Sequence, residues 1–177
     1  MLAGALLGGY PAGAQTVAPG PYYATPSWDQ QLPAASRFVV LANWNLEAVL
    51  DRETGLVWQR QPAETALAHA AAHTACMLVR TGGRGGWRLP TVDEIGSLLD
   101  TTPAAAGSGL PIGHPFMGVA GVAFQTATHE FSSDGTFAVF VQRVGPNADL
   151  LSAIPSIALR YWCVRGGANA QHVRGRN

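Results

Sequence analysis

The chain has no lysine and few charged side chains of any kind. Charged residues make up 12% of its 177 residues, and 11 basic residues, all arginine, balance 11 acidic ones for a net charge of zero. Without an excess of basic charge, the chain lacks the electrostatic footprint of a duplex-binding protein, so we expect no nucleic-acid partner. The low charge density leaves a surface of small and neutral polar side chains, which tolerates close packing against neighbours.

A hydrophobic run long enough to cross a bilayer is also lacking. Residues 2–9 form a short apolar run, and Ala12-Gly13-Ala14 has the small-x-small pattern of a signal-peptidase site, although the charged region that usually precedes such a run is missing. We expect residues 1–14 to be a signal peptide, and three interpretations stay open: its true start lies upstream, Met1 begins a truncated copy, or the segment is an apolar linker. The sequence thus predicts a secreted protein, extracellular or periplasmic, with no membrane span.

Cysteine is scarce, because Cys76 and Cys163 are the only two. Neither belongs to a CxxC motif or to a histidine-rich motif that indicates zinc, so we expect no metal centre and no cofactor. A disulfide and two unrelated buried thiols are the remaining interpretations. Export favours the disulfide, because oxidising compartments preserve such bonds.

Hydrophobic residues make up 47% of the chain, which is enough for the core of one domain. Residues 15–36 are rich in Pro, Gly, Ala and Tyr without helical or strand periodicity, which is typical of an extended arm or linker. We expect the folded domain over residues 37–167 and a flexible tail over residues 168–177. The arm carries aromatic side chains that no core is expected to bury and that are candidates for docking onto a neighbouring copy: Tyr22, Tyr23 and Trp28.

The first half of the domain is predicted to form strands followed by a helix. A strand is expected at residues 38–41, and a β-hairpin over residues 47–59 surrounds a polar turn that ends in glycine. An Ala-rich helix is predicted over residues 62–79, because Pro62 suits a first helical position. Its spacing predicts a buried face that holds Leu67, Ala71, Cys76 and Leu78.

The second half begins with a short helix and continues with strands. Thr91 and Glu94 have the spacing of a capping box, and Asp93 beside Glu94 suits the positive start of a helix. A catalytic carboxylate pair is the alternative interpretation of these acids. Further strands are expected at residues 122–128, 136–142 and 159–165. Three tryptophans at strand ends should form the core or its rim and have hydrogen-bonded indole nitrogens: Trp58, Trp87 and Trp162.

Neither the glycines nor the histidines form a recognisable catalytic motif. The glycine-rich residues 82–86 lack the Lys-Ser/Thr of a phosphate-binding loop and follow a helix rather than a strand. His69 and His73 share one helix face, but only alanines separate them, so the glutamate of a zinc-protease motif is absent. We interpret these histidines as an exposed polar stripe and expect the chain not to be an enzyme.

Four segments in this order resemble the Lcl C-terminal domain family, which is named after the end domain of a bacterial collagen-like adhesin. They are residues 49–59, the cysteine at the end of a helix, residues 86–94 and residues 163–167. The resemblance covers residues 37–167 and implies an α+β, C-type-lectin-like fold, with two helices packed on a small, mostly antiparallel sheet. It also implies one disulfide between Cys76 and Cys163.

The chain departs from the patterns of this family and of its sugar-binding fold relatives in several places. Family members commonly carry Tyr-Trp-Ser-Ser-Thr where this chain has residues 124–128, so the tryptophan is replaced. The named adhesin domain is associated with sulfated glycans, yet this chain has no lysine and no basic patch before its tail, so we do not carry that ligand over. The calcium-binding turns of C-type lectins are also absent, and Pro146-Asn147 is explained by a turn between strands.

We therefore expect an exported, non-catalytic binding module, lectin-like or adhesive, for a glycan or protein ligand. Its ligand surface is expected on the loops over residues 101–121, 128–134 and 145–156. The alternative is a structural subunit of an extracellular homo-oligomer or polymer that uses the arm for contacts. An enzymatic interpretation rests only on the likeness of the fold to formylglycine-generating enzymes. The candidate ligand residues on the loops are His114, His129, Asp134, Asn147 and Asp149.

Overall fold

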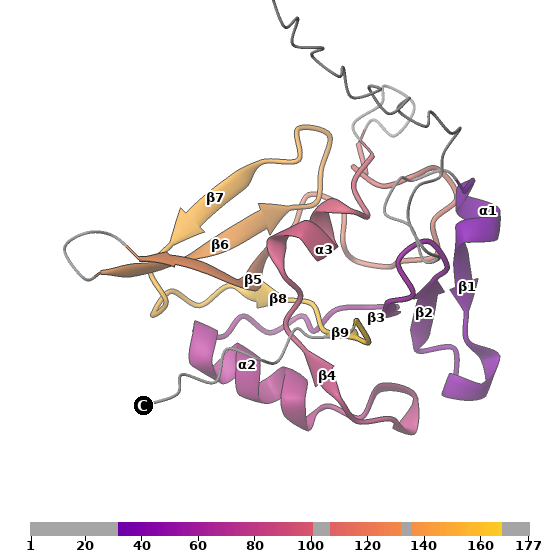
Figure 1. Ribbon diagram of the computed structural model, residues 1–177, viewed down its shortest axis with the longest axis horizontal. Helices are drawn as coiled ribbons and strands as arrows, with labels where there is room; N and C mark the ends of the chain where they lie inside the picture. Colours follow the sequence, from indigo (N-terminus) through magenta and orange to yellow (C-terminus); the bar gives the residue numbers. More distant parts are fainter. Residues whose placement is uncertain (1–31, 101–106, 132–135, 168–177) are drawn as a thin grey trace, which may run out of the picture.

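The computed structural model describes residues 32–100, 107–131 and 136–167, and these residues form two β-sheets with short helices around them (Figure 1). The first sheet has the order β1-β2-β3-β9-β4 and the second the order β7-β6-β5-β8. Neighbouring strands are antiparallel except for the parallel pair β5 and β8. The strands are β1 (Phe38–Val40), β2 (Ala48–Asp51), β3 (Val57–Gln59), β4 (Trp87–Arg88), β5 (Ala123–Phe131), β6 (Phe137–Arg143), β7 (Leu150–Ala153), β8 (Arg160–Tyr161) and β9 (Val164–Arg165).

Three α-helices lie in the described residues: α1 (Ala34–Arg37), α2 (His69–Leu78) and α3 (Val92–Gly96). Two 3-10 turns accompany them, η1 (Ala42–Trp44) and η2 (Thr81–Gly83). None of the described helices is long and apolar enough to span a membrane. The α+β class is confirmed, whereas the expectation of two helices on a single small sheet was too simple.

The folded part of the chain begins earlier than the sequence predicted. Residues 34–36 were assigned to the extended arm, but they form α1, and Ala34 belongs to the hydrophobic core. Arg37 at the end of α1 is buried and donates hydrogen bonds from Nε and Nη2 to the Asp51 carboxylate, at 2.9 and 2.8 Å. This buried ion pair fixes α1 to the turn of the β2–β3 hairpin.

Helix α2 is shorter than the predicted helix over residues 62–79. Leu67 and Leu159 form a β-bridge with reciprocal backbone hydrogen bonds of 3.0 Å, so the chain is still extended there and the helix begins only at His69. The buried face consists of Ala72 and Cys76. The prediction was correct for Cys76 but wrong for Leu78, which is 66% exposed at the end of the helix.

Helix α3 forms as its capping signal predicted. The Thr91 hydroxyl accepts a hydrogen bond from the Glu94 amide at 3.2 Å, and the Glu94 carboxylate accepts one from the Thr91 amide at 2.8 Å. The same carboxylate forms a buried, two-pronged ion pair with the Arg88 guanidinium, at 2.7 and 2.5 Å. The Glu94 carboxylate thus both caps α3 and holds Arg88 in a buried ion pair.

The predicted closing strand over residues 159–165 is divided between the two sheets. Strand β8 pairs with β5 in one sheet, and β9 lies between β3 and β4 in the other. Trp162 lies between them in the chain, and its fully buried ring lies 4.9 Å from Trp58, 5.0 Å from Phe116 and 5.5 Å from Phe124, measured between ring centroids. The core therefore gathers around Trp162.

The segment over residues 145–156 was expected to be a loop, but it contains β7. Leu150 pairs with Gln142 and Ala153 with Val139, so β7 extends the sheet beyond β6. Figure 1 shows β5, β6 and β7 reaching away from the rest of the domain. Pairing with β6 supplies the backbone partners that a four-residue apolar segment cannot supply for itself.

Candidate binding site around Trp44

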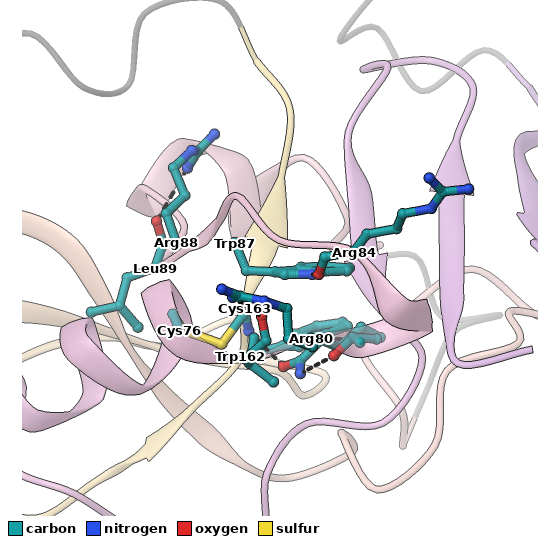
Figure 2. Close-up of a disulfide and its surroundings, with 11 residues drawn as sticks. Cys76, Arg80, Arg84, Trp87, Arg88, Leu89, Trp162 and Cys163 are labelled. Carbon is teal, nitrogen blue, oxygen red and sulfur yellow. Dashed lines mark hydrogen bonds between the residues drawn. A yellow bond between two sulfur atoms is a disulfide. The ribbon is translucent and has the colours of Figure 1, made fainter. Parts of the chain in front are cut away.

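The predicted disulfide is present and connects α2 to the closing segment. Cys76 and Cys163 are bonded, with their Cα atoms 5.5 Å apart, and both are fully buried (Figure 2). Gln59 in β3 secures the same segment, because its side-chain Oε1 accepts the Cys163 amide at 3.0 Å and its carbonyl accepts the Trp162 indole N–H at 2.8 Å. Its Nε2 donates to the Thr81 hydroxyl at 2.8 Å, which links η2 to the same point.

Trp44, at the end of η1, lies at the centre of a group of arginine and tryptophan side chains. The Cζ atoms of Arg84 and Arg165 lie 5.5 and 5.2 Å from the centroid of its ring, within the range of cation–π contacts. The Trp87 ring meets it edge to face, with centroids 6.3 Å apart. Arg165 belongs here because β4 and β9 pair Trp87 directly with Arg165.

The glycine-rich residues 82–86 allow this group to assemble. Gly82 has a φ of +61°, and a Cβ placed on it would lie 2.6 Å from the Cβ of Trp44. Only glycine therefore lets the backbone of η2 pack directly against Trp44. The Gly82 amide also donates to the Glu47 carboxylate at 2.6 Å, which holds η2 beside the start of β2.

Arg80 adds a third guanidinium next to the Trp44 group. Its Nη1 donates to the carbonyls of Leu78 and Val79, at 3.0 and 3.1 Å, at the end of α2. A Cβ placed on Gly85 would lie 3.5 Å from its Cζ, so Arg80 lies over the same glycine-rich turn. Figure 2 shows Arg80 and Trp87 beside the disulfide and the Arg84 side chain extending away from it.

These three arginines lack acidic partners in the part of the chain that the structure describes. Arg37, Arg88 and Arg143 each form an ion pair with a carboxylate, but Arg80, Arg84 and Arg165 do not. Arg80 and Arg84 are exposed, and Arg165 is half-buried. We call Trp44, Arg80, Arg84 and Arg165 the cationic cluster. A chain with zero net charge therefore carries a local excess of positive charge that its sequence does not show as a basic run.

A small polar pocket adjoins the cationic cluster on the other side of η1 and η2. Its volume is about 250 Å³, and its lining combines a carboxylate, a guanidinium, an amide and a hydroxyl with two apolar side chains, those of Leu46, Glu47, Arg60, Gln61, Thr81 and Met117. At its rim, Asn45 and Leu46 both have left-handed backbones, with φ of 55° and 59°. Such conformations are costly outside glycine, which is typical of functional sites.

A comparison with protein families identifies the chain. The family model of the Lcl C-terminal domain matches residues 47–165. The chain belongs to the Lcl C-terminal domain family. This points to a bacterial, extracellular, adhesin-like domain. Neither a curated protein nor a solved structure matches the chain.

Within this Lcl C-terminal domain, the position of the tryptophan missing from the family pattern has a structural role. Gln125 occupies it and is fully buried. Its Nε2 donates to the carbonyls of Leu67 and Leu159, at 2.9 and 3.0 Å, and its Oε1 lies 3.1 Å from His69 Nδ1. The replacement therefore secures the start of α2 and the Leu67–Leu159 bridge by hydrogen bonds.

Two of the candidate ligand segments of the Lcl C-terminal domain lie along the β5–β6–β7 part of the second sheet. In the β5–β6 pair, Phe131 is opposite Phe137 at one end, and Ala123 is opposite Arg143 at the other. His129 lies near the first end, whereas the turn that holds Asn147 lies beyond the second. The turn that holds Asn147 is therefore distant from His129, whereas Ala153, at the other end of β7, pairs with Val139, the residue opposite His129.

The individual candidate residues have different surroundings. The exposed His129 ring lies edge-on to Phe131 and Phe137, with centroids 5.2 and 5.7 Å apart. Asp149 forms an exposed ion pair with Arg143 at 3.5 Å, and Asn147 is exposed on the neighbouring turn. Asp134 lies outside the described residues, as do the arm residues Tyr22, Tyr23 and Trp28.

His69 and His114 are partly enclosed, whereas His73 is exposed, so the predicted exposed stripe of His69 and His73 is wrong for His69. His114 stacks on Phe116 with centroids 6.0 Å apart, and burial lowers the pKa of His114. The pKa of His69 is also lowered, mainly by burial, with smaller contributions from His73 and His129 that the hydrogen bond to the Gln125 side chain opposes. Among the described residues, no group of His, Cys, Asp or Glu is arranged to hold a metal ion.

The predicted tryptophan environments are largely confirmed. The indole N–H of Trp87 donates to the Arg84 carbonyl at 2.7 Å, and that of Trp162 donates to Gln59. Trp58 differs, because its buried Nε1 has no hydrogen-bond partner among the described residues. The Trp87 bond also fixes the backbone of Arg84 and so helps to position the cationic cluster.

Proposed function

We propose that this chain is an exported, non-catalytic adhesin-like module that binds an acidic glycan through the cationic cluster. The observation that carries the proposal is that Arg84 and Arg165 lie over the Trp44 ring and Arg80 lies over the adjoining glycine-rich turn, all three without carboxylate partners in the described residues. Guanidinium groups offer paired donors that match sulfate and carboxylate oxygens. The Trp44 indole lies beneath two of these guanidinium groups and so helps to hold them in place.

The polar pocket extends the proposed site. Glu47, Gln61 and Thr81 supply acceptors and donors of the kind that sugar hydroxyls require, and Leu46 and Met117 supply apolar contacts. A glycan chain that crosses η1 and η2 would place an acidic group on the cationic cluster and a neutral sugar in the pocket. The pocket carboxylate makes a second acidic group unfavourable there.

We further propose a C-type-lectin-like fold. It is supported by the antiparallel sheets, by the helix tied to the closing segment and by the presence of β1 and β9 in one sheet. The disulfide favours export, since such bonds persist in oxidising compartments. With Cys76 and Cys163 bonded together, neither offers the thiolate that an enzyme of the formylglycine-generating kind requires.

The test measures binding of the full chain to an immobilised heparin-type sulfated oligosaccharide and to its desulfated counterpart. Arg84→Gln and Arg165→Gln should each weaken binding about 10-fold or more, because hydrogen bonds to charged groups contribute about 1.5–3 kcal/mol. Arg84→Lys should restore only part of the loss, because lysine keeps the charge but not the paired donors. Arg52→Gln is the matched control, because Arg52 is exposed in the turn at the opposite end of the β2–β3 hairpin.

Three results would overturn the proposal. The first is equal binding of the sulfated and desulfated oligosaccharides. The second is an Arg52→Gln variant that loses as much affinity as Arg84→Gln, since general charge would then account for binding. The third is equally tight binding of a DNA duplex, because any polyanion would then suffice.

A further inference from the structure

The outer edge of β7 is the most apolar exposed edge of the second sheet. Strand β7 pairs with β6 on one side only, and no described strand pairs with its other side. Leu150 is 51% exposed and Leu151 is 44% exposed, although successive residues of a strand point to opposite faces. Both faces of this edge strand therefore present apolar side chains to solvent.

Proteins protect strand edges with charges, bulges, covering elements, short strands or proline. Among the described residues β7 has no charge, bulge or covering element, and only its shortness and the following Pro155 restrict its edge. The chain has no lysine, and residues 150–159 contain no charged side chain. Beyond the strand, Ile154 and Ile157 are also exposed, and Pro155 limits the length of the edge.

The pairing with β6 defines which backbone groups face outward. The Arg143 amide donates to the Asp149 carbonyl, so these two residues form a hydrogen-bonded pair. Such pairs alternate along an antiparallel ladder, so Leu151 is also hydrogen-bonded to β6, whereas Leu150 and Ser152 direct their N–H and C=O groups away from it. The outer edge therefore presents donors and acceptors on two alternate residues.

From these observations we propose that β7 pairs with β7 of a second copy of this chain, antiparallel and about a two-fold axis at Leu151. Leu150 of one copy then lies opposite Ser152 of the other, and all their outward N–H and C=O groups are paired. A second copy is the partner because the edge is self-complementary and because the zero net charge gives copies little mutual repulsion. The proposal is independent of glycan binding, since the cationic cluster involves the other sheet.

The proposed register makes a specific prediction for crosslinking. Leu151 of both copies would form a non-hydrogen-bonded pair with Cα atoms about 4.5 Å apart, which lies within the range that a disulfide requires. A Leu151→Cys variant of the full chain should therefore form a disulfide-linked dimer on mild oxidation, because both native cysteines are already bonded. Ile112→Cys, at a 70% exposed apolar position outside β7, is the matched control and should crosslink much more slowly.

Sedimentation equilibrium of the unmodified chain and of edge variants completes the test. The unmodified chain should dimerise with increasing concentration, and Leu150→Lys should raise the dimer dissociation constant at least about 10-fold, equivalent to about 1.4 kcal/mol. Ser152→Pro should have the same effect, because it removes an outward N–H without removing a bond to β6. Ile112→Lys should leave the constant unchanged, and circular dichroism should show that each variant is folded.

Two outcomes would overturn the proposal. One is an unmodified chain that remains monomeric at the highest soluble concentration. The other is association that persists in Leu150→Lys together with slow crosslinking of Leu151→Cys, which would locate the contact elsewhere, for example on the arm over residues 15–31.

Discussion

Breaking the disulfide should remove a large part of the stability of this domain. The bond joins residues 87 positions apart, so it closes a loop that contains β4, α3 and the strands from β5 to β8. The chain-entropy relation for a loop of this length gives about 4–5 kcal/mol at 25 °C. Because domains of ordinary stability unfold at a cost of about 5–15 kcal/mol, the reduced chain should be marginally folded at best.

Urea titration of the oxidised and reduced chain, followed by tryptophan fluorescence, measures this difference. Trp58 and Trp162 are fully buried with their rings in contact, so unfolding changes their surroundings. A double variant, Cys76→Ala with Cys163→Ala, should resemble the reduced chain but be somewhat less stable, because it also loses two buried sulfur atoms. Reductant should not affect this variant, which controls for other effects of the reagent.

One result would refute the loop-entropy reasoning. If reduction lowered the free energy of unfolding by less than about 1 kcal/mol, the bond would not restrict the unfolded chain as the relation requires. A full effect in the double variant with none on reduction would instead attribute the stability to packing of the cysteine side chains. The predicted order of stability is therefore oxidised, then reduced, then double variant.

Two further predictions concern pH and the glycine-rich turn. Burial lowers the pKa of His69 in the folded chain below its ordinary value of 6.5, so the unfolded chain takes up the proton first as the pH falls. The contribution of His69 to the free energy of unfolding should therefore be fully present above pH 6.5 and decrease below it. His69→Gln should flatten this decrease in melting temperature between neutral and mildly acidic pH, whereas substitution of the exposed His73 should matter less. Gly82→Ala should lower the free energy of unfolding more than Gly83→Ala, because both glycines have positive φ but only Gly82 lies against Trp44. Gly82→Ala should also weaken binding of the sulfated oligosaccharide. Equal effects of the two substitutions in calorimetry would contradict the packing argument.

The features that the sequence predicted correctly are those with local signals. The β2–β3 hairpin follows from apolar runs around a polar turn, and α3 follows from the spacing of Thr91 and Glu94. The disulfide was favoured because the chain has two cysteines and an expected export route, and the family resemblance gave the same pairing. In each case, the residues that determine the structure are close in sequence or few in number.

The features that the sequence did not predict depend on pairing between distant segments. Helix α2 begins at His69 rather than Pro62, because Leu67 pairs with Leu159 across more than half of the domain. Strand β7 has a weak pattern of its own and exists because β6 offers it a partner. Helix propensity and alternation within a segment contain no information on such partners.

The cationic cluster shows the same limit at the level of function. Arg80 and Arg84 are four residues apart, but Arg165 is distant in sequence and is brought to them only by the pairing of β4 with β9. A search for basic runs therefore finds nothing before the tail. The clue available in the sequence was the glycine-rich segment over residues 82–86, which lacks the Lys-Ser/Thr of a phosphate-binding loop and whose packing role requires a neighbour such as Trp44.

The stability and the proposed binding of this domain depend on the same contacts. Gln59 hydrogen-bonds to the segment that contains Cys163 and to Thr81, so the disulfide, η2 and β3 are joined at one point directly beneath the cluster. Arg165 follows Cys163 by two residues, and Arg80 follows Cys76 by four, so the covalent bond restricts both arginines. A site whose backbone is ordered on folding loses less conformational entropy when a ligand binds. Under the proposed function, the domain holds Arg84 and Arg165 over one tryptophan before an acidic ligand arrives.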